Sequence, residues 1–201
     1  MRPRIRPAPA AGEALYSAFV LVLVLGLRRG EVLGLAWDQV DLEAAELYVG
    51  EQLQRVRHQL VLREVKTETS EAPLPLPDLC VSALRIRERL QDKDRKAAGD
   101  RWIDNGLVFT TRHGTLIEPR NFNRSFDRLI RAARVLRITV HGTRKTCAPL
   151  LVALDVHPRV AMRILRHLPA SRGRSGGFGK GRRPVRLSAD RALFSVPAIA
   201  R

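Results

Sequence analysis

The sequence predicts an α+β fold that is mainly α-helical, with a small three-stranded antiparallel sheet. Apolar residues make up 45% of the 201 residues, which is enough for the core of one ordinary domain. Most apolar positions recur at helical spacing, whereas the block from residue 47 to residue 77 changes to the shorter period of strands. The prolines in residues 73–77 are compatible only with an edge strand, which completes the sheet.

The elements are predicted in order along the chain. Residues 1–12 consist mostly of Pro, Ala and Arg, so we expect a disordered basic arm. The predicted helices are residues 13–25, 29–37, 78–97, 119–134, 141–154 and 158–167, and the predicted strands are residues 47–49, 59–65 and 72–77. Prolines open the helices at 119 and 158, where the missing N–H costs nothing. In the helix from 119, the side chains of Phe122, Phe126, Leu129 and Ile130 are predicted to face the core.

The formal net charge of +16 is concentrated at the ends of the chain. Residues 168–201 contain eight Lys or Arg and one Asp, and they have no helical or strand period. We therefore predict a basic, disordered tail rich in Gly, Arg and Pro. This charge pattern favours a polyanionic partner, most simply a nucleic acid.

Several classes of protein are disfavoured by what the sequence contains. The two cysteines, Cys80 and Cys147, are far apart and are interpreted as reduced thiols of a cytosolic protein. The apolar run of residues 18–27 is too short to span a bilayer, so we expect no membrane partner. No His, Asp and Glu residues have metal-ligand spacing, and we expect no metal and no cofactor.

A histidine and an arginine three residues apart, His141 and Arg144, precede the apolar run of residues 149–154. On one helical turn the two side chains lie on the same face. Buried beside an apolar helix, both would require an anionic partner, and a phosphate suits a guanidinium and an imidazole together. The alternative is a capped helix start with two solvated basic residues.

Three further basic residues stand at helix ends or turns. Arg28 lies where one predicted helix ends and the next begins, with Glu31 three residues later. Lys66 is predicted in a hairpin turn, and His167 ends the last apolar helix. Such positions let scattered side chains converge on one ligand. In-line displacement at a DNA phosphodiester would use this set, because arginines offset the charge on phosphate oxygens and a lysine can protonate the leaving 5′-oxygen.

These motifs resemble those of the tyrosine recombinases, the phage integrase family. Residues 26–35 (GLRRGEVLGL) with residues 37–41 (WDQVD) are similar to the first arginine box, and residues 65–67 (VKT) with 73–77 (PLPLP) to the β-hairpin lysine motif. Residues 141–147 (HGTRKTC) are similar to the His-x-x-Arg box, and residues 164–167 (ILRH) to the last histidine motif. The resemblance covers residues 13–167 and implies a fold like that of the recombinase catalytic domain.

The resemblance implies a role for each matching residue. Arg28 and Arg144 would clamp the scissile phosphate, while His141 and His167 would support it by hydrogen bonding and proton transfer. Lys66 would be the general acid, and Glu31 a buried carboxylate that orients the site. Taken singly, Arg28 could instead cap a helix and Lys66 could be a solvated turn residue. The partners implied are double-stranded DNA and other recombinase subunits on that DNA, in the bacterial cytosol or nucleoid.

The chain departs from the family pattern at the nucleophile, a tyrosine expected shortly after the last histidine. No tyrosine follows His167, and Phe178 in that region lacks the hydroxyl. Tyr16 is predicted in the core helix and Tyr48 in a strand, so both are interpreted as structural. We therefore expect a cleavage-deficient chain without a nucleophile.

Two hypotheses explain the missing tyrosine at the C-terminal end and the short N-terminal segment. Residues 168–201 would come from a shifted reading frame or a degraded gene end, and an N-terminal DNA-binding domain would be missing, so the catalytic domain would be truncated. The alternative functions are a non-catalytic DNA-binding or vestigial integrase fragment, and an RNA- or ribosome-associated basic protein. Only charge and the basic tail support the last of these.

Overall fold

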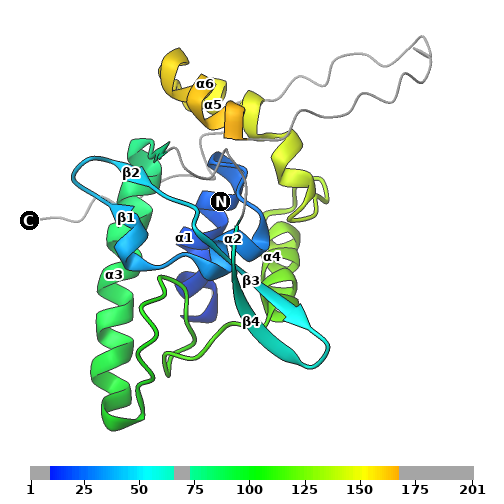
Figure 1. Cartoon of the computed structure of the whole chain (residues 1–201). Coiled ribbons are helices and arrows are strands. Elements are labelled where there is room, and N and C mark those ends of the chain that lie inside the picture. Colours follow the sequence, from blue (N-terminus) through cyan, green and yellow to red (C-terminus); the bar gives the residue numbers. More distant parts are fainter. Residues whose placement is uncertain (1–9, 66–72, 168–201) are drawn as a thin grey trace, which may run out of the picture. The chain divides into compact units, whose positions relative to one another are not determined.

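The computed structural model describes residues 10–65 and 73–167, and Figure 1 shows how their elements are arranged. The helices are α1 (Ala10–Val24), α2 (Arg29–Gly34), α3 (Asp78–Ala98), α4 (Pro119–Ala133), α5 (Cys147–Ala153) and α6 (Pro158–His167). Short 3₁₀ turns are η1 (Trp37–Gln39), η3 (Gly99–Arg101) and η4 (Gly142–Lys145). The strands are β1 (Val40–Asp41), β2 (Glu46–Leu47), β3 (Glu51–Val56), β4 (Gln59–Glu64) and β5 (Leu74–Pro75). The predicted class, mainly helical with a small antiparallel sheet, is confirmed.

Helix α1 lies at the centre of the core and contacts α2, α3, α4 and α5. The ring of Phe19 in α1 packs against two rings of α4. The ring centroids are 5.1 Å apart for Phe19 and Phe122 and 5.4 Å apart for Phe19 and Phe126. The prediction that α4 buries Phe122, Phe126 and Ile130 is confirmed. It is wrong for Leu129, which is 39% exposed, because the buried stripe of α4 follows the four-residue spacing of the other three.

The three-stranded sheet exists, but one of its strands differs from the prediction. Its order is β1-β2-β5, and β5 is an edge strand, as its prolines require. The predicted strand at residues 59–65 is β4, which pairs instead with β3 in a separate antiparallel hairpin. The two-residue turn at Arg57 and His58 closes this hairpin, with Arg57 at a φ of 54°. Such turns favour Gly, Asn or Asp, so these residues give no hairpin signal.

Three helix predictions differ from the structure in their bounds. The helix expected over residues 29–37 ends at Gly34, and Trp37 begins the separate 3₁₀ turn η1. Helix α1 begins at Ala10, three residues before the predicted start. The helix expected over residues 141–154 is divided into the 3₁₀ turn η4 and the α-helix α5. The turn after it is present, with Asp155 at a φ of 52°. Leu107 and Thr110 form isolated antiparallel bridges to Ala36 and Leu116.

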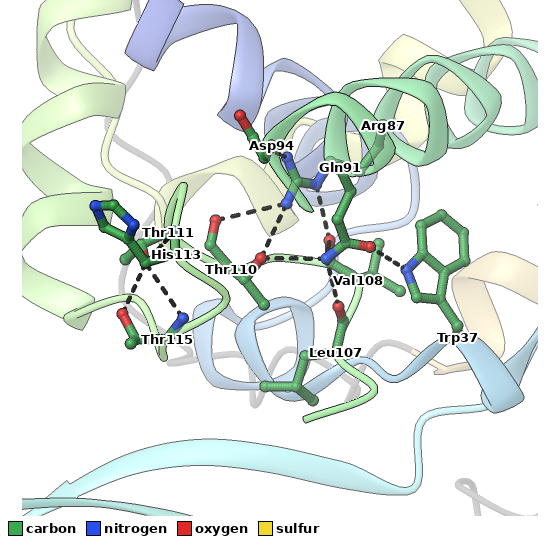
Figure 2. Close-up of polar contacts among 10 residues, drawn as sticks. All are labelled: Trp37, Arg87, Gln91, Asp94, Leu107, Val108, Thr110, Thr111, His113 and Thr115. Carbon is green, nitrogen blue, oxygen red and sulfur yellow. Dashed lines mark hydrogen bonds and ion pairs between the residues drawn. The ribbon is translucent and has the colours of Figure 1, made fainter. Parts of the chain in front are cut away.

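A buried polar network joins α3 to the segment that follows it (Figure 2). Arg87, with no exposed surface, donates to the carbonyl oxygen of Val108 at 2.8 Å and to the hydroxyl of Thr110 at 3.2 Å. Gln91 donates to the carbonyl oxygen of Leu107 at 2.9 Å and accepts from the indole N–H of Trp37 at 2.6 Å. The network therefore satisfies carbonyl groups that no strand partner reaches, and it ties α3 to the region of η1.

Close packing between α2 and β3 depends on two glycines. A Cβ on Gly34 would stand 2.9 Å from the Cα of Gln52 and 2.9 Å from the nitrogen of Leu53, both in the backbone of β3. A Cβ on Gly30 would stand 3.0 Å from the carbonyl oxygen of Leu53, with the next atom at 3.5 Å. The glycines thus let the hairpin lie directly against the helix that follows Arg28.

We expect the Gly34→Ala variant to be less stable than the Gly30→Ala variant by about 1–3 kcal/mol, the usual cost of overpacking. Both changes replace glycine in the same short helix, a gain in helix propensity of up to roughly 1 kcal/mol. Their difference therefore reports the larger number of close contacts that the Cβ at position 34 makes with the β3 backbone. Urea unfolding followed by circular dichroism measures this difference. Equal stability of the two variants would contradict the packing argument.

Candidate functional site

A pocket of about 550 Å³ opens between α2, β3, the start of α4 and the segment that contains η4. Its lining residues are Arg28, Arg29, Gly30, Gln52, Leu53, Gln54, Arg55, Pro119, Asn123, Thr139, Val140, His141 and Arg144. Four of them are arginines and none is an aspartate or glutamate. The lining is therefore electropositive and suits an anion.

The first arginine of the pocket is held by a buried carboxylate. Arg28 precedes α2, and its backbone N–H donates to Oε2 of Glu31 at 2.7 Å. The guanidinium Nη1 of Arg28 donates to the other oxygen, Oε1, also at 2.7 Å. The Glu31 side chain is only 1% exposed, whereas that of Arg28 is 48% exposed. Glu31 thus completes half of a capping box and fixes the direction of Arg28 at the pocket.

The second arginine, Arg144, is largely buried and only partly satisfied. Its side chain is 10% exposed, and its Nη1 donates to the carbonyl oxygen of Gly26 at 2.6 Å. The same nitrogen lies 3.9 Å from Oε2 of Glu31, while Nη2 is buried with no hydrogen-bond partner among the described residues. Burial lowers the pKa of Arg144, against the opposite effect of Glu31. An unpaired buried donor at a pocket wall is costly unless an acceptor arrives from outside.

The end of α1 determines where Arg144 lies. The last carbonyl groups of a helix have no partner within it. The thiol of Cys147 donates to the carbonyl oxygen of Val24 at 2.9 Å, beside the bond from Arg144 to Gly26. Burial raises the pKa of Cys147 to about 11, so the thiol stays protonated as this donor requires. Side chains of η4 and α5 therefore hold the His-x-x-Arg segment against the end of α1, next to Arg28.

The structure brings together four of the six residues predicted for the site. Arg28, His141 and Arg144 line one pocket, with Glu31 directly behind the two arginines. Lys66 lies outside the described residues. His167 is the last residue of α6, and only its backbone is described. The assignments of Lys66 and His167 stay predictions.

Other sequence expectations about the site have mixed outcomes. Tyr48 is 45% exposed and follows β2 instead of lying within a strand, whereas Tyr16 lies in α1 as predicted. Sequence reasoning missed six lining residues with polar side chains, namely Arg29, Gln52, Gln54, Arg55, Asn123 and Thr139. Three of these lie on β3, the strand that was not predicted.

Two further findings concern the described ranges, 10–65 and 73–167. No group of three His, Cys, Asp or Glu side chains there is arranged to hold a metal ion. None of the described helices combines the length and apolar character needed to cross a membrane.

The model of the phage integrase family matches residues 7–171. A "Tyrosine recombinase XerC-like" protein of Caldanaerobacter subterraneus subsp. tengcongensis is 27% identical over 168 residues, covering 78% of this chain and 43% of the relative. An "Integrase" of Streptomyces ambofaciens is 31% identical over 127 residues, covering 62% of this chain and 33% of the relative. The chain thus spans less than half the length of these relatives.

Two solved structures share the fold at low sequence identity. The Tn1549 transposon integrase, in complex with circular intermediate DNA, has a TM-score of 0.58 at 23% identity, covering 83% of this chain and 60% of that one. The XerA recombinase has a TM-score of 0.54 at 19% identity, covering 84% and 58%.

Proposed function

Because the chain belongs to the phage integrase family, the tyrosine recombinases, we propose that it is the catalytic domain of a site-specific DNA recombinase and binds a phosphodiester of duplex DNA. One observation carries the proposal. Arg28 and Arg144 meet around the buried carboxylate of Glu31, at a pocket with no acidic lining residue. Two guanidinium groups against one carboxylate leave an excess positive charge that one phosphodiester neutralises.

In the proposed chemistry, the two arginines bind the non-bridging oxygens of the scissile phosphate. They offset the negative charge that develops there during in-line displacement. Glu31 holds both guanidinium groups in place before DNA arrives, so little reorganisation is needed. His141 donates a hydrogen bond to the same phosphate. Lys66 as general acid and His167 as a second supporting residue complete this proposal, on the strength of the motifs.

The cleavage step requires a nucleophile that this sequence lacks after His167. In the reaction, a tyrosine oxygen forms a bond to phosphorus while the bond to the 5′-oxygen breaks, and the leaving oxygen takes a proton from the general acid. We propose that the chain alone binds DNA without cutting it, and that cutting needs a tyrosine from another recombinase subunit on the same DNA. Its place of action would be the bacterial cytosol or nucleoid.

A second candidate function is a non-catalytic DNA-binding fragment of a former integrase. It is favoured by the same pair of facts: the arginine pair is intact, and no tyrosine follows the last histidine motif. The two candidates share the phosphate site and differ only in whether a tyrosine supplied by another chain can use it.

A nicked suicide duplex, in which cleavage releases a short strand and traps the adduct, separates these candidates. With this protein alone we expect salt-sensitive binding and no covalent adduct, because phosphate contacts release counterions whereas the attacking hydroxyl is missing. Denaturing gel electrophoresis detects an adduct, and a gel-shift series in rising salt detects the binding. An adduct formed by the chain alone would overturn the assignment of cleavage deficiency. If the protein shows no salt-sensitive binding to the duplex, the proposal that it binds DNA is wrong.

A further inference from the structure

One wall of the pocket has no role in the reaction described above. It is formed by β3 and the start of α4, and it presents Arg55 and Asn123 to the same space as Arg28 and Arg144. Arg55 lies near the end of β3 and Asn123 in the second turn of α4. Basic and amide groups on this wall can bind the same class of ligand as the arginine pair.

The guanidinium group of Arg55 is held in a defined direction. Its Nη1 forms an ion pair with Oε2 of Glu118, the residue that directly precedes α4. The Arg55 side chain is 40% exposed and that of Glu118 is 25% exposed. Exposed ion pairs add little to stability, so stability alone does not account for this one. Among the described residues, Nη1 is the nitrogen of Arg55 that pairs with Glu118, which leaves Nε and Nη2 for another acceptor.

The positive charge of the pocket exceeds what one anionic group would neutralise. Four arginines line the pocket, and the neighbouring carboxylates are not part of the lining. Glu31 pairs with Arg28 and Arg144, and Glu118 pairs with Arg55. One phosphodiester has a single negative charge and satisfies the Arg28 and Arg144 pair. Each strand of duplex DNA supplies the next phosphate after about 3.4 Å along the helix axis.

We propose that Arg55, with Asn123 beside it, forms a second phosphate subsite that binds a neighbouring phosphate of the strand held by Arg28 and Arg144. The Oδ1 atom of Asn123 is buried without a hydrogen-bond partner among the described residues. Which end of the amide is oxygen and which is nitrogen is interchangeable by half a rotation, so the NH₂ group can serve as a donor at this wall. This subsite rests on the proposed function and extends it: contact with a second phosphate fixes the direction in which the strand passes the arginine pair.

The test is the salt dependence of binding to a fluorescein-labelled duplex of mixed sequence, measured by fluorescence anisotropy with the full chain. The logarithm of the binding constant falls linearly with the logarithm of the salt concentration, and each lost phosphate contact reduces the magnitude of this slope by about 0.9. We expect this reduction for Arg55→Gln and a restored slope for Arg55→Lys, which keeps the charge. The matched control is Arg85→Gln, because Arg85 is an exposed arginine paired with Glu43 and is not part of the pocket.

A further variant, Arg28→Gln, separates failure of this inference from failure of the proposed function. If Arg28→Gln lowers the slope and Arg55→Gln behaves like Arg85→Gln, DNA binding at the arginine pair stands and the second subsite is overturned. If neither Arg28→Gln nor Arg55→Gln differs from Arg85→Gln, both proposals fail. Thermal melts confirm that each variant is folded.

Discussion

Replacing Arg144 with methionine is expected to weaken binding of duplex DNA by roughly tenfold to a hundredfold. A hydrogen bond to a charged group contributes about 1.5–3 kcal/mol, and about 1.4 kcal/mol corresponds to a tenfold change in affinity. Arg144 is suited to this contact because it lines the pocket and its Nη2 has no hydrogen-bond partner among the described residues. Fluorescence anisotropy at fixed salt measures the change.

The matched control for Arg144 is Arg101→Met, the same chemical change at an exposed position of η3. This control should lower affinity only through the loss of one distant charge. Arg144→Lys should fall between the two, because an ammonium group keeps the charge but cannot bond Gly26 and a phosphate as a planar fork does. If the methionine variants at 144 and 101 are both folded and bind equally, Arg144 is not a phosphate ligand.

The Arg87→Met variant is expected to lose about 3–5 kcal/mol of the free energy of unfolding, the usual cost of removing one partner from a buried charged contact. Its guanidinium donates to the Val108 carbonyl and the Thr110 hydroxyl, and it lies 3.7 Å from the carboxylate of Asp94. Methionine would fill much of the volume but remove the short bond to the Val108 carbonyl, leaving the amide of Gln91, at 3.4 Å from that oxygen and 3.1 Å from the Thr110 hydroxyl, as the remaining donor (Figure 2). Urea unfolding followed by circular dichroism measures the loss.

For Arg87, the control is Arg89→Met, an exposed position of the same helix, where we expect a change within about 0.5 kcal/mol. Both variants remove one positive charge from a chain of net charge +16, so the effect of net charge cancels between them. Equal stability would mean that water or other donors reach the carbonyl groups of residues 108–110.

The central arginine pair of the site could be predicted from the sequence because its signals are local. Arg28 and Glu31 are three residues apart across a helix start, a spacing that places the carboxylate beside the guanidinium. His141 and Arg144 share one turn before an apolar run, and all four residues match ordered family motifs. The long periodic helices α3 and α4 were predictable for the same reason.

What the sequence did not predict depends on tertiary contacts. The strand β3 has weak alternation, and the hairpin it forms closes through Arg57, a residue type that rarely adopts positive φ. Missing β3 concealed Arg55 and the second wall of the pocket. Arg87 belongs to a charged helix in the sequence, and its burial follows from carbonyl groups 21 to 23 residues further along the chain.

The hydrogen bonds from Arg144 to Gly26 and from Cys147 to Val24 connect parts of the chain that are far apart in sequence, with separations of 118 and 123 positions. A ribosome adds residues in sequence order, so Arg28 leaves the exit tunnel long before Arg144 does. The anion site is therefore one of the last parts of the domain to form during translation. A nascent chain released before residue 144 would contain Arg28 and Glu31 but lack the second arginine of the proposed phosphate site.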